Sequence, residues 1–147
     1  MPDDFPGWWF QAGDQDTAAR CERLEQALAN DIDNWRFCPY IQRHEFEALV
    51  LAAQAYLGDL FDADDQLSGL ARLRSEIDGI NPEEINDSPA TAPSKRLLRQ
   101  IPGYRKSEDG PDAIEMASLS SVRSHCPRFD AWLTGLETWG LFENQPC

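Results

Sequence analysis

The residues best suited to chemistry are His44, Glu45 and Glu47, which lie between an expected strand and an expected helix. Two carboxylates and an imidazole at such a junction could bind Mg²⁺ or orient a water molecule, with Glu45 and Glu47 as the metal ligands. On a regular helix these two carboxylates point about 160° apart, so they share an ion only if His44 and Glu45 precede the first helical turn. The alternative is that His44 and Glu45 serve helix capping and dipole complementarity while Glu47 is solvated.

A second candidate site is the only basic cluster of an acidic chain. Its members are Lys95, Arg96, Arg99, Arg105 and Lys106. A phosphate group or a nucleic acid could dock there, with Lys95, Arg96 and Lys106 as its contacts, and pairing with nearby carboxylates is the alternative. The acidic run from Asp59 to Asp65 lacks the glycine and glutamate of a calcium-binding loop, so a solvated loop is expected there.

The elements that would position these residues follow from apolar spacing. The segment Trp35–Gln42 alternates apolar side chains and predicts one strand, with Pro39 favouring an edge position. The next helix is expected to carry an apolar stripe from Phe46 to Leu57 and to stop at Gly58. Further helices are expected at about 16–30, from Leu67 to Ile77, from Asn81, and at 94–100, 111–118, 120–125 and 127–138, with loops at 86–94 and 102–112.

Composition limits the classes of partner. The 13 Lys and Arg against 26 Asp and Glu give a net charge of −13, which opposes non-specific binding to phosphate backbones and anionic membranes. The four cysteines show no CxxC spacing, so reduced thiols are expected. The acidic N-terminal segment and the absence of an apolar run of about 18 residues predict a cytoplasmic protein without a membrane partner.

Four ordered stretches carry a family resemblance, and they contain the strings PYIQRHEFEAL, PEEIND, TAPSKRL and CPRFDAWL. Together they resemble the domain-of-unknown-function family 4276, whose members are similar to Toprim-type folds. The resemblance implies an α/β fold class, a mostly helical fragment of a Toprim-like or Rossmann-like domain with few strands. Residues 1–147 are expected to form a single domain, the C-terminal part of a Toprim-like domain that lacks its N-terminal strands and their two acidic residues.

Two functions are compatible with this resemblance. The first is a metal-dependent nucleic-acid-processing protein that works with an AAA/ABC-type ATPase in bacterial DNA metabolism or defence. His44, Glu45 and Glu47 would then line a site for Mg²⁺ or Mn²⁺, with DNA as substrate, once the missing N-terminal residues supply further ligands. The second is a non-catalytic interaction module or truncated remnant. Self-association through an exposed sheet edge is expected in either case.

Overall fold

The computed structural model describes residues 17–85 and 90–139, and all regular elements within these ranges are helices. The expected α/β fold class is therefore wrong, because no strand or sheet forms among the described residues. The described chain divides into two compact units. One contains residues 17–43 and 129–139, and the other, which we call the central unit, contains residues 44–85 and 90–128.

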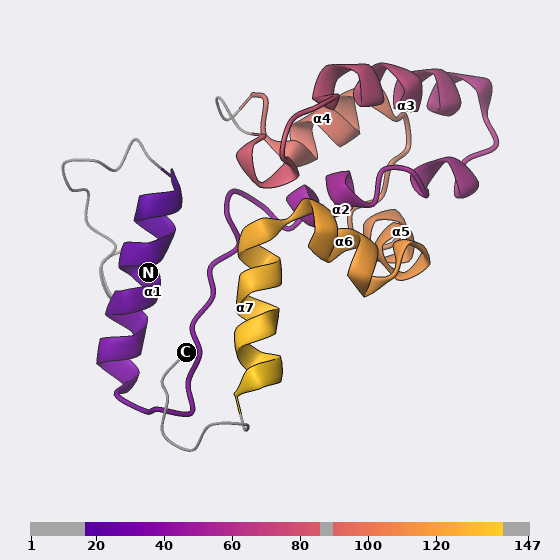
Figure 1. Ribbon diagram of the computed structural model, residues 1–147. Coiled ribbons are helices and arrows are strands. Elements are labelled where there is room, and N and C mark those ends of the chain that lie inside the picture. Colours follow the sequence, from indigo (N-terminus) through magenta and orange to yellow (C-terminus); the bar gives the residue numbers. More distant parts are fainter. Residues whose placement is uncertain (1–16, 86–89, 140–147) are drawn as a thin grey trace. The chain divides into compact units, whose positions relative to one another are not determined.

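The first unit contains α1 (Thr17–Ile32), an irregular segment and most of α7 (Pro127–Thr138). Helix α1 forms where the helical spacing predicted it, and it buries Cys21 and Leu24. The segment that follows α1 runs between the two helices of this unit (Figure 1). None of the described helices is long and apolar enough to cross a membrane.

The predicted strand at Trp35–Gln42 is this irregular segment, and its backbone groups are bound by helices in place of a neighbouring strand. The Ile41 amide donates to Glu25 Oε1 at 2.8 Å, and Trp132 Nε1 donates to the Cys38 carbonyl at 3.2 Å. The Tyr40 ring stacks on Trp132 with centroids 4.8 Å apart. An alternating apolar pattern thus produces an extended segment between helices, and the sheet edge expected for self-association is not formed by the described residues.

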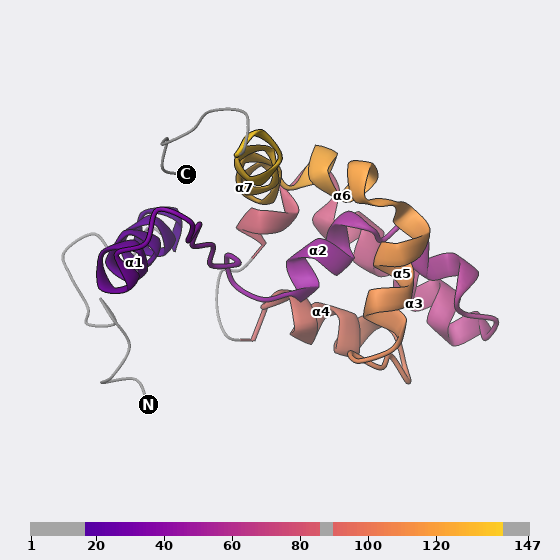
Figure 2. The same cartoon turned by 90° about the horizontal axis from the view of Figure 1, so that it is seen from below.

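The central unit is built around α2 (Glu47–Ala52), with the short 3₁₀ helix η2 (Leu57–Asp59) after it. Every residue of α2 is buried, and all of them except Glu47 are apolar, as expected for a helix at the centre of a unit. Four helices complete this unit: α3 (Asp64–Ile77), α4 (Pro93–Gln100), α5 (Asp109–Ala117) and α6 (Leu119–His125), together with η3 (Pro82–Glu84). Helix α2 packs against α4, α5, α6 and η3, with α4 and α6 on opposite sides of it (Figure 2).

Helix α2 ends at Ala52, six residues before the predicted stop at Gly58. The chain instead turns and buries Leu57 through η2. The carbonyl groups released by this turn are bound by Arg74 of α3, whose Nη2 donates to Gln54 O and Ala55 O at 3.0 Å each. A tertiary contact therefore sets the end of this helix.

The cysteines are not all reduced thiols. Cys21 and Cys126 are buried free thiols, as predicted. Cys38 is disulfide-bonded, so the prediction is wrong for this residue. Residue 147 lies outside the described residues.

Candidate functional site

The three predicted site residues lie at the start of α2. This helix begins at Glu47, so His44 and Glu45 precede its first turn. Their side chains are therefore not held to helical spacing, which is the condition under which Glu45 and Glu47 could point toward one ion. His44 has a φ of 67°, in the left-handed region that residues other than glycine rarely adopt. The chain therefore enters α2 through a sharp change of direction at the residue before Glu45.

Glu45 acts as a cap for another helix. Its Oε2 accepts a hydrogen bond of 2.9 Å from the backbone amide of Ser94, in the first turn of α4. Ala92, at the cap position of α4, has no side chain that could accept this bond. Partial burial raises the pKa of the Glu45 carboxyl, but the hydrogen bond from the Ser94 amide and the charges of Lys106 and Lys95 outweigh it and leave the pKa below its ordinary value.

Glu47 is a buried carboxylate with a positive partner. Lys106 Nζ lies 3.3 Å from Glu47 Oε1, and the side chain of Glu47 is only 10% exposed. The same Lys106 charge acts on Glu45, so one ammonium group serves two carboxylates. The structure thus brings Glu45, Glu47, Lys95 and Lys106 into one neighbourhood, although the sequence left them as two separate candidate sites.

Tyr104 lies beside this neighbourhood. Its side chain is buried, and its hydroxyl has no hydrogen-bond partner among the described residues. Burial, together with the negative charges of Glu47 and Asp109, raises the pKa of Tyr104 well above its ordinary value. The phenol therefore stays protonated at neutral pH, which makes it a poor nucleophile.

The carboxylates here do not by themselves fit the needs of a hard divalent cation. Mg²⁺ takes near-octahedral oxygen coordination, and the described residues contain no group of three or more His, Cys, Asp or Glu side chains that could hold a metal ion. One oxygen of Glu45 is bound to an amide, and one oxygen of Glu47 is paired with an ammonium group. The Mg²⁺ or Mn²⁺ site stays a prediction that requires ligands from outside the described residues.

A second buried glutamate, which the sequence did not single out, repeats the arrangement of Glu45. Glu83 in η3 is 1% exposed, and its Oε2 accepts a hydrogen bond of 2.8 Å from the Arg128 amide, in the first turn of α7. The two helices that are capped in this way both begin with a proline, Pro93 in α4 and Pro127 in α7. The local signal was a helix that starts with proline and lacks a side-chain cap directly before it.

The predicted basic cluster is divided among several carboxylates. Arg99 Nη2 lies 2.9 Å from Glu76 Oε2 and Arg96 Nη1 lies 3.5 Å from the same atom. Arg105 pairs with Glu108 and Asp109 through its guanidinium group. Because Lys106 pairs with Glu47, the three predicted phosphate contacts Lys95, Arg96 and Lys106 do not share one partner, and their role in binding stays a prediction.

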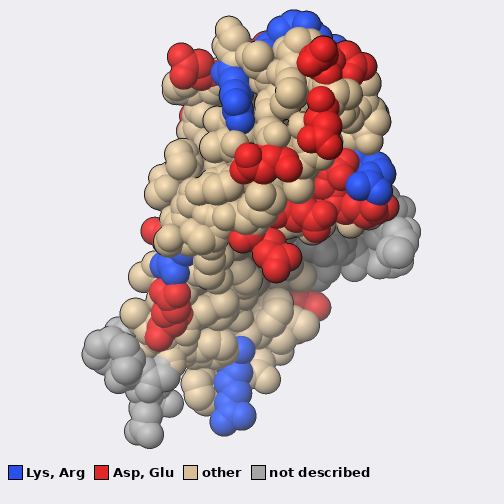
Figure 3. All heavy atoms as spheres, turned by 90° about the vertical axis from the view of Figure 1, so that its right-hand side faces the viewer, with Lys and Arg blue, Asp and Glu red and all other residues tan. Residues whose placement is uncertain are grey.

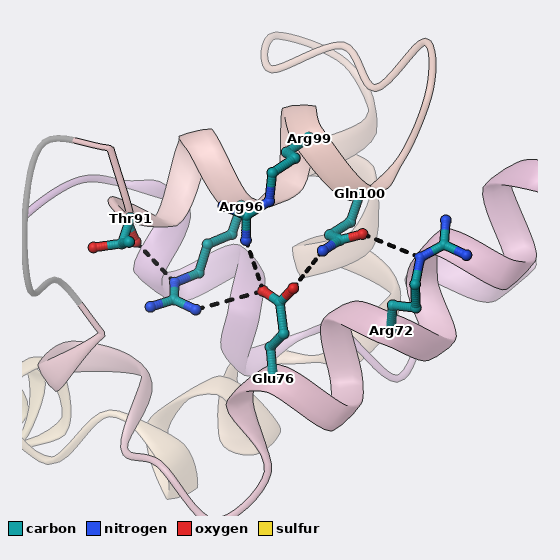
Figure 4. Close-up of polar contacts among 6 residues, drawn as sticks. All are labelled: Arg72, Glu76, Thr91, Arg96, Arg99 and Gln100. Atoms are coloured by element: carbon teal, nitrogen blue, oxygen red, sulfur yellow. Dashed lines mark hydrogen bonds and ion pairs between the residues drawn. The ribbon is translucent and has the colours of Figure 1, made fainter.

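The structure adds residues of α3 that the sequence could not place beside the basic helix. Gln100 Nε2 donates to Glu76 Oε1, and Gln100 Oε1 accepts a bond of 3.3 Å from Arg72 Nε (Figure 4). Only tertiary packing of α3 on α4 makes these contacts. On the face drawn in Figure 3, acidic side chains are more widespread than basic ones. A group of basic side chains that outnumbers its acidic neighbours is therefore unusual in a protein with a net charge of −13.

Of the comparisons with known proteins, the one with family models gives a match. No curated protein and no solved structure matches the chain. A family model described as "Domain of unknown function (DUF4276)" matches residues 1–137, which include all four stretches that carried the resemblance. The chain therefore belongs to the DUF4276 family.

Proposed function

We propose that this chain acts as a non-catalytic helical interaction module. The observation that carries the proposal is the use of two glutamates from the family-like stretches, Glu45 and Glu83, as caps for helices that begin far along the chain. Each carboxylate accepts an amide hydrogen bond that the helix start would otherwise lack. Glu45, one of the acidic residues most suggestive of catalysis, thus has a structural use within the central unit.

The ion pair of Glu47 supports the same proposal. A carboxylate that is 10% exposed needs a charged or hydrogen-bonding partner, and Lys106 supplies one. Glu47 in turn begins α2, where a negative charge interacts favourably with the helix dipole. The same pair of residues therefore fastens the loop that carries Lys106 to the central helix.

A metal titration, combined with a stability measurement, tests this proposal. We expect Glu45→Ala to lower the free energy of unfolding by about 1 kcal/mol, because it removes the acceptor for the Ser94 amide. Glu45→Gln keeps an acceptor oxygen and should retain most of this stability. We expect wild type and Glu45→Gln to give the same weak, unsaturable heat with Mn²⁺ in calorimetry, and Glu115→Gln, an exposed glutamate of α5, is the matched control.

The opposite result identifies the competing function. Saturable Mn²⁺ binding that Glu45→Gln or Glu47→Gln weakens, while Glu115→Gln does not, would refute the structural assignment. It would favour a metal-dependent nucleic-acid-processing protein instead. The convergence of Glu45, Glu47 and Lys106 in one neighbourhood is the observation that keeps this second candidate in view.

The finer assignments stay predictions that rest on the motif resemblance, except that the cytoplasmic location rests on composition and self-association on the predicted sheet edge. They are the Toprim-like relationship, the placement of this chain in the C-terminal part of such a protein, an AAA/ABC-type ATPase as partner, DNA as substrate, a role in defence, self-association and a cytoplasmic location. Under the present proposal, an ATPase or another protein would be bound by the helical surfaces, and no chemistry at Glu45 or Glu47 would be required.

A further inference from the structure

Two guanidinium groups contact a single carboxylate on the surface of the central unit, and a third is linked to it through a glutamine side chain. We call Arg72 of α3 with Arg96 and Arg99 of α4 the arginine cluster (Figure 4). Arg96 and Arg99 both contact Glu76 Oε2, at 3.5 and 2.9 Å. Arg72 is joined to the same carboxylate through Gln100, which accepts from Arg72 and donates to Glu76.

The charges of this cluster do not balance. The linked side chains include three guanidinium groups and one carboxylate, and Arg72 contacts only Gln100, which leaves an excess of two positive charges in a chain whose net charge is −13. At physiological ionic strength charges are screened over about 8 Å, so a ligand at this surface responds to the local excess more than to the distant acidic residues. An anion is therefore the complementary ligand.

The cluster also offers hydrogen-bond donors in fixed positions. Arg96 is only 12% exposed and its Nε donates to Thr91 O at 2.8 Å, which holds the guanidinium in place. Arg72 uses Nε alone in its bond to neutral Gln100, and Arg99 uses one Nη group on Glu76. The remaining N–H groups of Arg72 and Arg99 face solvent, since both side chains are exposed.

The geometry points to a binding site for a phosphate monoester at the arginine cluster, and this inference does not depend on the roles of Glu45 and Glu47. A monoester carries a charge of about −1.5 to −2 at neutral pH and presents three terminal oxygens. Planar guanidinium forks match such oxygens in pairs, which lysines cannot do. Arg72 and Arg99 would be the direct contacts, and Arg96, Glu76 and Gln100 would hold them in position.

The test is a titration of the full chain with phosphoserine as the monoester probe, followed by the NMR signals of the arginine Nε–H groups at constant ionic strength. We expect saturable shifts of the Arg72 and Arg99 signals. Arg72→Gln and Arg99→Gln should each weaken binding about fivefold or more, because each removes a charged fork. Arg105→Gln, an arginine of similar exposure paired with Glu108 and Asp109, should leave binding unchanged.

Further variants and ligands distinguish paired hydrogen bonding by guanidinium groups from a general attraction of anions. Arg72→Lys keeps the charge and should still weaken binding, and the bond of Arg72 to Gln100 is long enough at 3.3 Å that this variant should fold normally. Inorganic phosphate should bind at the same signals, and a short DNA oligonucleotide tests phosphodiesters as the source of the phosphate. Tighter oligonucleotide binding that depends on Arg72 would overturn the monoester assignment. Equal binding by wild type, Arg72→Gln and Arg105→Gln would overturn the site itself.

Discussion

Replacing Gly69 by alanine should separate two helices that now touch. Gly69 lies on the buried side of α3, and a Cβ atom built there would be 1.6 Å from the Gln100 carbonyl oxygen and 2.7 Å from its carbon. Real Cβ atoms essentially never come closer than 3.0 Å to another heavy atom, so the end of α4 must retreat by about 1.4 Å. The obstacle is backbone, and a change of side-chain rotamer cannot relieve it.

The cost follows from what this movement disrupts. Four side chains are almost completely buried in the central unit: Leu70 and Leu73 on α3, Leu97 on α4 and Ile101 directly after α4. Overpacking of such a core costs about 1 to 3 kcal/mol, and a backbone obstacle places the cost near the upper value. The higher helix propensity of alanine relative to glycine offsets about 1 kcal/mol of this cost. We therefore expect Gly69→Ala to lose about 2 kcal/mol of unfolding free energy.

Urea unfolding followed by circular dichroism measures this difference, with Gly58→Ala as a control from the same unit. A Cβ on Gly58 would meet only Leu70 Cδ2 at 3.5 Å and Arg74 Nη2 at 3.7 Å, which are ordinary contacts. This control should change stability by less than about 0.5 kcal/mol. If Gly69→Ala is as stable as wild type with the same m value, the close approach of α3 and α4 is wrong.

Two further predictions concern titratable groups. Burial and then the charge of Glu83 raise the pKa of Cys126 to about 12. This thiol should therefore resist alkylation by iodoacetamide in the folded protein at mildly alkaline pH and react only after unfolding. Mass spectrometry of the labelled peptide checks this prediction, and rapid labelling of the native protein would contradict it. The lowered pKa of Glu45 means that its contribution to stability is complete above the pKa of the unfolded state and is lost as the pH falls through the lower pKa of the folded state. Thermal unfolding measured from about pH 6 to about pH 2 should therefore show a smaller acid-induced loss in Glu45→Gln than in wild type, and parallel curves would disprove the cap.

Local pattern was sufficient for several helices and failed where tertiary contacts decide the structure. Helices α1, α3, α4 and α7 formed close to their predicted bounds, because helical spacing and proline starts are properties of neighbouring residues. The strand at Trp35–Gln42 failed because a strand exists only when another strand pairs with it, and here helix side chains bind the backbone instead. The end of α2 depended on Arg74, which lies 20 residues beyond Gln54. The spacing of apolar residues along the helix cannot reveal such a distant contact.

The candidate site shows the same division between local and distant information. The sequence marked the position of Glu45 and the idea of capping, but it assigned the cap to the helix that Glu45 precedes. The capped helix is α4, whose Ser94 lies 49 residues away. The sequence predicted only part of the arginine cluster for the same reason. Arg96 and Arg99 share α4, whereas Arg72 and Glu76 belong to α3.

The two distant caps bear on how the buried acidic residues of this chain should be interpreted. Helices α4 and α7 each begin with proline, which supplies no amide to the first turn but leaves the next amide, of Ser94 or Arg128, in need of an acceptor. Around Arg128 the acceptor is Glu83, which at 1% exposure cannot be replaced by bulk water without opening the core. A buried carboxylate of this kind is required by the fold even in a protein without catalysis. Glu45 and Glu83 of this chain therefore have a physical reason to be present before any metal or substrate is invoked, and a catalytic role for Glu45 must be shown against that structural role.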